Sequence, residues 1–165
     1  MNKKRPKTIT QEEALRRLQR YCAYQDRCHQ EVRSKLLDLG IYGMELEEII
    51  VELISDNFLN EERFACSYAR GKFRIKRWGR IRIRQELKKR QISDYCIKKA
   101  MQEIEEETYR KALIDLLIYK KGLLKEPNEY QLRNKLAQYA FNKGFESKLV
   151  WEVFKNLNSS DESIS

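Results

Sequence analysis

Apolar residues along the chain follow the spacing of one helical face, and the same pattern occurs three times. A five-residue element of the form apolar–Arg–x–(Lys or Glu)–Leu stands at 32–36, 83–87 and 132–136. The leucines that close it are 51 and 49 residues apart and are expected to be equivalent core residues: Leu36, Leu87 and Leu136. Further apolar residues follow at offsets of 5, 8, 9 and 12 from Ile41, Ile92 and Phe145. Because these offsets lie on one face of a helix, the pattern predicts three copies of one helical unit.

A third apolar helical segment precedes each copy, near Ala14, Phe64 and Ala112, so each unit is predicted to contain three helices. A unit of about 50 residues is small and is stabilised by stacking on its neighbours. The predicted fold is therefore all-α: a tandem array of three three-helix repeats, elongated and curved. The expected divisions are a basic flexible tail at 1–10, the first repeat at 11–57, the second at 58–106, the third at 107–157 and a flexible tail at 158–165.

The starts and ends of several helices are marked by capping residues. Thr10 followed by Glu13 forms a capping-box pattern, and Asn60 and Ser93 are suited to cap the helices that follow them. Gly40 and Gly144 fit the left-handed residue that ends a helix. In the third repeat the stretch after the five-residue element is four residues longer, which is close to one helical turn.

The composition supports a helical fold and indicates the cellular compartment. Only six Gly and two Pro occur in 165 residues, which argues against the many turns of an all-β protein. No apolar run approaches the roughly 18 residues of a membrane span, and none follows the basic start as a secretory signal would require. The four cysteines, Cys22, Cys28, Cys66 and Cys96, form no CxxC pair, and His29 is the only histidine. We therefore expect reduced thiols, no metal site and a cytoplasmic location.

Positive charge is concentrated in the second repeat. Residues 63–99 hold eight Arg and six Lys against two acids, a balance of +12, whereas the rest of a chain with total charge +9 carries −3. A field of one sign this dense predicts an anionic partner rather than a solvated surface. Ten residues are expected to contact that partner: Arg70, Lys72, Arg74, Lys76, Arg77, Arg80, Arg82, Lys88, Lys89 and Arg90.

Four further residues have two interpretations each. Trp78 can stack on a base or anchor an interface, and it can equally pack at a helix junction, where Gly79 is expected to let the chain turn. Arg33, Arg84 and Arg133 recur at one place in the three units, so a structural role between units is as good an interpretation as partner contact.

Sequence motifs of catalysis are missing from the chain. It contains no GxxxxGK[ST] loop, no GxGxxG and no HExxH, and its paired acids fall where helix starts explain them. We therefore expect a protein that is not an enzyme, with no catalytic residues and no cofactor.

Two segments resemble the RecX family of recombinase regulators. Residues 58–68 resemble the family's (Y/F)-L-(D/N)-(D/E)-x-x-(F/Y)-A-x-x-(Y/W) segment, and residues 79–92 are similar to its G-x-x-(R/K)-I-x-x-E-L-x-x-(R/K)-G-I helix. Gln91 stands where that helix usually has Gly, which predicts a less sharp turn. Residues 27–36 are similar to S-x-x-E-L-x-x-K-L, and the resemblance extends over residues 14–157.

The resemblance implies a function that the composition does not show. RecX-like proteins are non-enzymatic and bind the RecA filament on single-stranded DNA, lying in its groove across neighbouring protomers. They thereby restrain ATP hydrolysis, strand exchange, filament growth and repressor cleavage. On this basis we expect a monomer whose partners are the RecA filament and the single-stranded DNA within it, and no membrane.

Two other classes of function remain open. One is a nucleic-acid-binding protein acting without RecA, with helices at 79–89 and 93–105 as a helix-turn-helix; the other is a helical scaffold for an acidic protein. Binding to single-stranded DNA, with and without RecA and ATP, separates the three.

Overall fold

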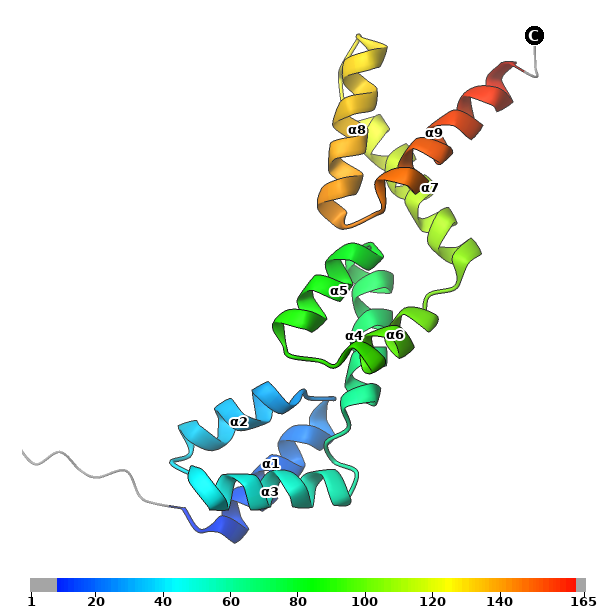
Figure 1. Ribbon diagram of the computed structural model, residues 1–165. Coiled ribbons are helices and arrows are strands. Elements are labelled where there is room, and N and C mark those ends of the chain that lie inside the picture. The colour runs from blue at the N-terminus through cyan, green and yellow to red at the C-terminus, as the bar shows by residue number, and fades with distance from the viewer. Residues whose placement is uncertain (1–8, 163–165) are drawn as a thin grey trace, which may run out of the picture.

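The protein is described by a computed structural model covering residues 9–162, in which the chain forms nine α-helices and no strand (Figure 1). The helices follow one another in three triplets. The first triplet is α1 (Gln11–Tyr24), α2 (His29–Asp38) and α3 (Gly43–Ser55). The middle triplet is α4 (Glu61–Lys76), α5 (Arg80–Lys89) and α6 (Asp94–Gln102). The last triplet is α7 (Glu106–Leu123), α8 (Glu129–Lys143) and α9 (Ser147–Glu162).

The ends of the chain differ in part from expectation. Residues 1–8 and 163–165 lie outside the described part of the chain, so most of the expected basic tail is not described. At the other end α9 continues to Glu162, so the segment expected to be a tail from 158 is helical as far as that residue.

The expected caps form as local side-chain hydrogen bonds. The backbone N–H of Glu13 donates to Thr10 Oγ1 at 3.1 Å, and that of Arg63 donates to Asn60 Oδ1 at 2.8 Å. Ser93 Oγ accepts from the backbone N–H of Cys96 at 3.3 Å. Each bond satisfies one of the amide groups that the first turn of a helix leaves without an intrahelical partner.

The turn after α5 keeps the left-handed geometry that a glycine would adopt. Gln91 has φ 58°, so the expectation of a less sharp turn is wrong: the glutamine takes the same conformation at a steric cost. Its backbone N–H still donates to the Lys88 carbonyl at 2.9 Å, and the N–H of Ile92 donates to Leu87 at 3.2 Å. The hydrogen bonds that end α5 therefore impose the left-handed conformation on this residue, although it carries a side chain.

Gln91→Gly is accordingly expected to stabilise the protein. Relief of the left-handed strain exceeds the entropy that glycine adds to the unfolded chain, for a net gain of about 0.5–1 kcal/mol. Thermal unfolding should show a melting temperature raised by on the order of 2 °C. A melting temperature that falls would mean that the Gln91 side chain stabilises the turn by contacts that outweigh the strain.

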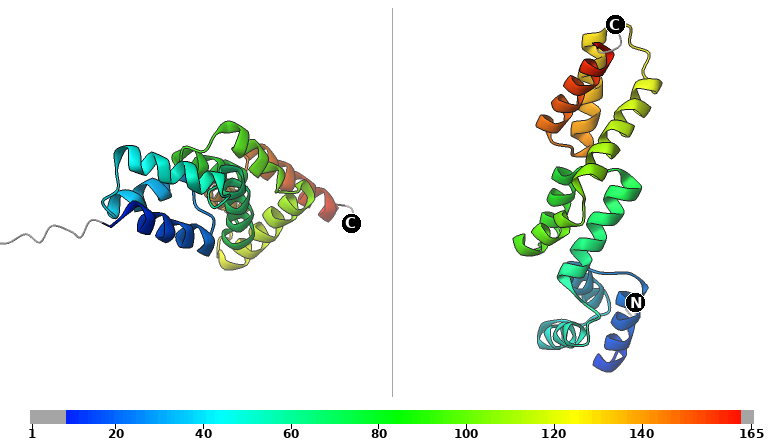
Figure 2. Two further views of the ribbon diagram at one scale, coloured as in Figure 1. Left: turned by 90° about the horizontal axis from the view of Figure 1, so that it is seen from below. Right: turned by 90° about the vertical axis from the view of Figure 1, so that its right-hand side faces the viewer.

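The three triplets stack end to end into an elongated molecule (Figure 2). In the right-hand view the first triplet lies at one end and the last triplet at the other, with the middle triplet between them. The helix pairs that pack most extensively, led by α4 with α6, all lie within one triplet. Small-angle scattering should therefore give a radius of gyration clearly above the roughly 15 Å of a compact globule of this length, and a value near 15 Å would contradict the stack.

The buried residues follow the threefold pattern read from the sequence. Leu36 and Leu87 are fully buried and Leu136 is 5% exposed, which confirms them as equivalent core positions. The residues that begin each downstream series, Ile41, Ile92 and Phe145, are also buried. The register ends early in the last triplet, where Leu157 is 39% exposed.

The apolar residues form two cores rather than three. One core belongs to the first triplet alone, around Leu18, Leu36 and Leu53. The other runs without a break through the middle and last triplets, from Phe64 to Phe154. The single residue of the first triplet that joins the second core is Cys28, which is fully buried at the start of α2. The two later triplets are thus one packed body, and the first is attached to it through a smaller contact.

Candidate functional site

Most of the ten predicted contact residues lie on α4 and α5, but the structure divides them into two kinds. Four are engaged by carboxylates. Arg70 pairs with Glu103, the residue after α6, at 3.0 Å, and Arg80, with 17% of its side chain exposed, pairs with Glu106 and Glu146. Lys89 and Arg90 both pair with Glu86, at 2.9 and 3.1 Å, and their hydrogen bonds lower the pKa of that carboxyl group. These four cations hold the fold together as well as carrying charge.

Besides Arg80, three of the cations are held against aromatic rings. Lys72 Nζ lies 5.3 Å from the ring centre of Tyr68 and 5.0 Å from that of Trp78. The guanidinium of Arg90 also lies over the Tyr68 ring, 4.9 Å from its centre, and that of Arg82 lies 4.2 Å from the ring centre of Trp78. Cation–π contacts of this kind restrict long side chains without neutralising them. Lys72 and Arg82 are therefore held in place with their charge unpaired, while Arg90 also pairs with Glu86.

Trp78 itself packs at the helix junction. It is half-buried, meets Tyr68 edge to face with ring centres 6.5 Å apart, and contacts the shared core of the middle and last triplets. The ring therefore packs at the junction with the Arg82 and Lys72 cations against it, and a role in stacking on a base or anchoring an interface stays a prediction.

The remaining predicted contact residues are exposed and carry uncompensated charge. These residues are Arg74, Lys76, Arg77 and Lys88. Like Arg84, they form no ion pair with any residue that the structure describes. Three of these follow one another at the end of α4, where Arg77 closes the helix in the left-handed conformation with φ 56°. The positive charge available to a partner is therefore greatest around the end of α4.

Two clefts open along α4 and meet at that same end. The first cleft, of about 430 Å³, lies between the first and middle triplets, with Asp26 and Glu31 on one wall and Tyr68, Lys72 and Arg90 on the other. The second cleft, of about 370 Å³, lies between α4 and the last triplet. Ile75 and Lys76 line both clefts, and the Ile75 side chain is 79% exposed between them. The two clefts, joined by these shared residues, are together called the α4 groove here.

The second cleft contains basic and aromatic residues of the last triplet that the sequence argument missed. Lys143 and Tyr139 of α8 line it beside Lys76 and Arg77. Lys120 Nζ lies 4.7 Å from the ring centre of Tyr139, and Lys143 Nζ donates to the Lys76 carbonyl oxygen at 3.4 Å. Acidic and basic residues mix along α7 and α8, so charge runs could not single these lysines out. The stacking of the triplets brings them to the α4 groove.

Backbone hydrogen bonds join the start of α5 to the end of α8, beside Lys143 of the second cleft. The N–H of Gly79 donates to the Lys143 carbonyl at 2.7 Å, and that of Ile81 donates to Gly144 at 3.0 Å. A Cβ atom on Gly79 would lie 2.2 Å from the Gly144 carbonyl carbon. Gly79 has an ordinary φ of −77°, so its expected role in a turn is wrong. The glycine is needed because the start of one helix meets the end of another.

Tyr109 closes this junction from inside. The residue is fully buried, accepts a hydrogen bond from the backbone N–H of Arg80 at 3.1 Å and donates to Glu146 at 2.7 Å. Burial and the Glu146 carboxylate raise the pKa of this hydroxyl well above its ordinary value, so it stays protonated. The Arg80 guanidinium lies over its ring at 3.9 Å. Arg80 is thereby tied to the last triplet from both sides.

The three recurrent arginines have different surroundings. Arg33 binds Glu47 of α3 through two hydrogen bonds, of 2.6 and 3.0 Å. Arg133 lies 5.8 Å from the ring centre of Phe154 in α9. Arg84 is exposed. The described contacts of Arg33 and Arg133 therefore lie within their own triplets.

The cysteines and carboxylates form no described site of metal or thiol chemistry. Within residues 9–162 no group of three or more His, Cys, Asp or Glu side chains could hold a metal ion. All four cysteines are free thiols, and burial raises the pKa of each. They are therefore poor nucleophiles at neutral pH. Among the described helices, none combines the length and apolar character needed to cross a bilayer.

Comparison with known proteins finds sequences similar to this chain. Residues 60–101 match the family model described as the second three-helix domain of RecX. The chain is 26% identical over 144 residues to a regulatory protein RecX from Prosthecochloris aestuarii, a match that covers 87% of this chain and 93% of that one. It is 31% identical over 145 residues to the one from Streptococcus uberis, covering 84% of this chain. The chain spans about half of that longer relative, 53% of its length.

Solved structures give the same result for the fold. The crystal structure of RecX from Lactobacillus salivarius superposes with a TM-score of 0.81 over 90% of this chain and 96% of that one, at 24% identity. A second crystal structure of regulatory protein RecX superposes with a TM-score of 0.80 over 88% of this chain. Matches in sequence along most of the chain, and in the arrangement of all three triplets, show that the chain belongs to the RecX family.

Proposed function

We propose that this protein binds the RecA filament assembled on single-stranded DNA and restrains RecA activity, using the basic face formed by α4 and α5. RecX proteins carry the name of regulatory proteins, and such a regulator acts by binding rather than by catalysis. The observation that carries the proposal is the set of exposed, unpaired cations at the end of α4 and along α5, which has no neutralising partner among the described residues.

The electrostatics favour a partner that is itself an extended polyanion. A surface that keeps uncompensated cations raises the local concentration of anionic partners and speeds association. The first triplet offers no comparable face, because its acidic residues outnumber its basic ones and its arginines at positions 16, 17 and 33 pair with glutamates. We therefore assign the filament contact to Arg74, Lys76, Arg77, Arg84 and Lys88 first, and to the ring-bound Lys72 and Arg82 second.

The α4 groove is the path we propose for the single strand within the filament. It combines the cations of two triplets with the rings of Tyr68 and Tyr139, which is the combination that single-stranded nucleic acid uses, with phosphates on cations and bases beside aromatic faces. The elongated stack of triplets suits a partner longer than one protomer.

Binding to fluorescent single-stranded DNA, with and without RecA and ATP, tests the proposal. Binding is expected to be far stronger with RecA present. It should weaken steeply between about 50 and 200 mM salt, because several of its contacts release counterions. Equal binding without RecA would favour a nucleic-acid-binding protein acting alone. Binding in neither condition would favour the scaffold for an acidic protein.

The helix-turn-helix alternative has a structural difficulty. The start of α5 is closed by the end of α8 through the Gly79–Lys143 and Ile81–Gly144 hydrogen bonds. The second helix of that motif, which would read the DNA groove, is α6; it packs on α4 and has the acidic Asp94 in its first turn. The filament proposal has no such requirement, because its cations lie along the sides of α4 and α5.

A further inference from the structure

The first triplet is joined to the rest of the molecule through a short polar connection. After α3 ends, the backbone N–H of Phe58 donates to the Leu53 carbonyl at 2.9 Å, and Leu59 is buried in the core of the first triplet. Asn60, with extended backbone at φ −142° and ψ 111°, then caps α4. One extended residue therefore separates the packed end of the first triplet from α4. Rotation about its backbone would swing one body against the other.

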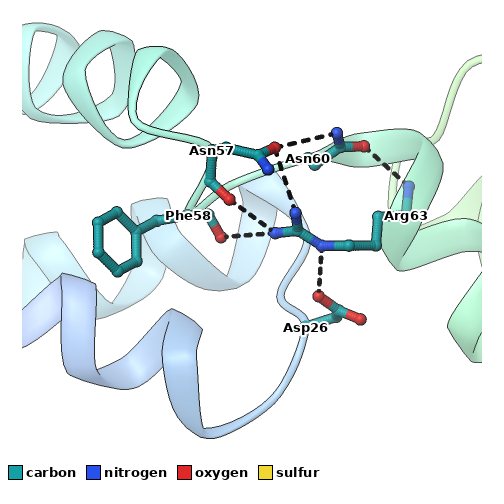
Figure 3. Close-up of polar contacts among 5 residues, drawn as sticks. All are labelled: Asp26, Asn57, Phe58, Asn60 and Arg63. Carbon is teal, nitrogen blue, oxygen red and sulfur yellow. Dashed lines mark hydrogen bonds and ion pairs between the residues drawn. The ribbon is translucent and has the colours of Figure 1, made fainter.

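Arg63 spans this connection from the first turn of α4 (Figure 3). Its Nε donates to Asp26 Oδ1 at 2.8 Å, in the loop between α1 and α2. One terminal nitrogen donates to Asn57 Oδ1 at 3.2 Å, and the other donates to the carbonyl oxygens of Asn57 and Phe58 at 3.0 and 3.1 Å. All four acceptors belong to the first triplet or to the segment that ends it. A single guanidinium thus binds the first triplet at two separate points.

The surrounding residues prepare the acceptors for this fork. Asn57 adopts the left-handed conformation with φ 61°, which ends α3 and turns the carbonyls of Asn57 and Phe58 toward Arg63, as Figure 3 shows. Asn60 Nδ2 donates to Asn57 Oδ1 at 3.4 Å while its own Oδ1 accepts from the Arg63 backbone. Lysine could not replace the arginine, because the donors of an ammonium all sit on one nitrogen, whereas these acceptors are bound by three different nitrogens of the guanidinium.

The geometry points to Arg63 as a clamp that sets the angle of the first triplet against the basic body, and hence as a positioning residue for filament binding. The apolar contact at the same junction is small, because Cys28 is the only residue of the first triplet in the shared core of the middle and last triplets. The hydrogen bonds of Arg63 therefore fix the relative orientation of the two bodies, which the small apolar contact alone does not. This inference rests on the proposed function for its second half only; the clamp is a property of the free protein.

The test separates orientation from folding. Spin labels at Met44→Cys in α3 and Tyr95→Cys in α6, both exposed positions, report the distance between the first and middle triplets in a Cys66→Ser background. The wild-type protein should give one narrow distance distribution, and Arg63→Gln a broad one with helicity unchanged. Arg110→Gln is the matched control, because Arg110 has 36% of its side chain exposed against 37% for Arg63 and pairs with Glu152 inside the last triplet.

A second variant and a second readout complete the test. Asp26→Ala removes one arm of the clamp without touching α4 and should broaden the distribution to a lesser degree. If only about a tenth of Arg63→Gln molecules hold the binding orientation, inhibition of RecA ATPase should weaken about tenfold, because apparent affinity falls with that fraction. An unchanged distance distribution in both variants would overturn the clamp. A broadened distribution with full inhibition would overturn the positioning role, and a wild-type protein that does not inhibit RecA would instead overturn the proposed function and leave the clamp standing.

Discussion

Gly79→Ala is expected to break the junction between the middle and last triplets. A Cβ at this position would lie 2.2 to 2.4 Å from three backbone atoms of Gly144 and Phe145, and backbone cannot move aside as a flexible side chain can. Relief requires the start of α5 to leave the end of α8, with loss of the hydrogen bonds from Gly79 and Ile81. The expected cost is about 3 kcal/mol, which is the upper range of overpacking, or a fall in melting temperature on the order of 10 °C.

A second glycine of the same helical region supplies the control. Gly71 lies inside α4, and a Cβ there would meet nothing within 4 Å. Gly71→Ala should therefore raise stability by about 0.5–1 kcal/mol through helix propensity. Both variants are compared by thermal unfolding followed by circular dichroism. If Gly79→Ala melts with the wild-type protein, the two triplets are not joined in solution as described.

Reversing three charges at the end of α4 is expected to have the largest effect on function. Arg74, Lys76 and Arg77 are exposed and unpaired among the described residues, so Arg74→Glu/Lys76→Glu/Arg77→Glu changes the partner-facing charge by six units with little loss of native contacts. At about 0.5 kcal/mol per exposed charge the binding free energy falls by about 3 kcal/mol, which is on the order of a hundredfold in affinity. Single changes to alanine should each weaken binding only about twofold.

The control for that variant makes the same change elsewhere. Arg16→Glu/Arg17→Glu/Arg20→Glu removes three exposed arginines of α1, none of which lines either cleft of the α4 groove. It alters total charge equally, so a general effect of net charge would weaken both variants alike. Helicity of each is checked by circular dichroism. Inhibition lost to the same degree in both would show that long-range charge, rather than the end of α4, attracts the filament.

The sequence predicts the helices and core well because both depend on local spacing. The threefold register identified Leu36, Leu87 and Leu136 without any knowledge of how the triplets stack, and the caps at Thr10, Asn60 and Ser93 act within one turn. The early end of the register at Leu157 is the exception, since none of the described helices covers this position.

The site could be located from the sequence but not resolved into its parts. Charge density identified α4 and α5, yet the carboxylates that engage Arg70 and Arg80 lie 33 and 66 residues further along the chain. Packing of α6 on α4 brings Glu103 to Arg70, whereas the stacking of triplets brings Glu146 to Arg80 and adds Lys143 and Tyr139 to the α4 groove. The close approach of Gly79 to Gly144 is equally a product of packing between triplets, so a glycine interpreted locally as a turn was misassigned.

RecA ATPase on single-stranded DNA, measured with rising amounts of this protein at physiological salt, tests the proposed function most directly. The wild-type protein and the α1 triple variant are expected to inhibit ATP hydrolysis alike, while Arg74→Glu/Lys76→Glu/Arg77→Glu, folded to the same helicity, needs on the order of a hundred times more protein for the same effect. Equal inhibition by the folded α4 variant would contradict the assignment of the filament contact to the basic face of α4 and α5.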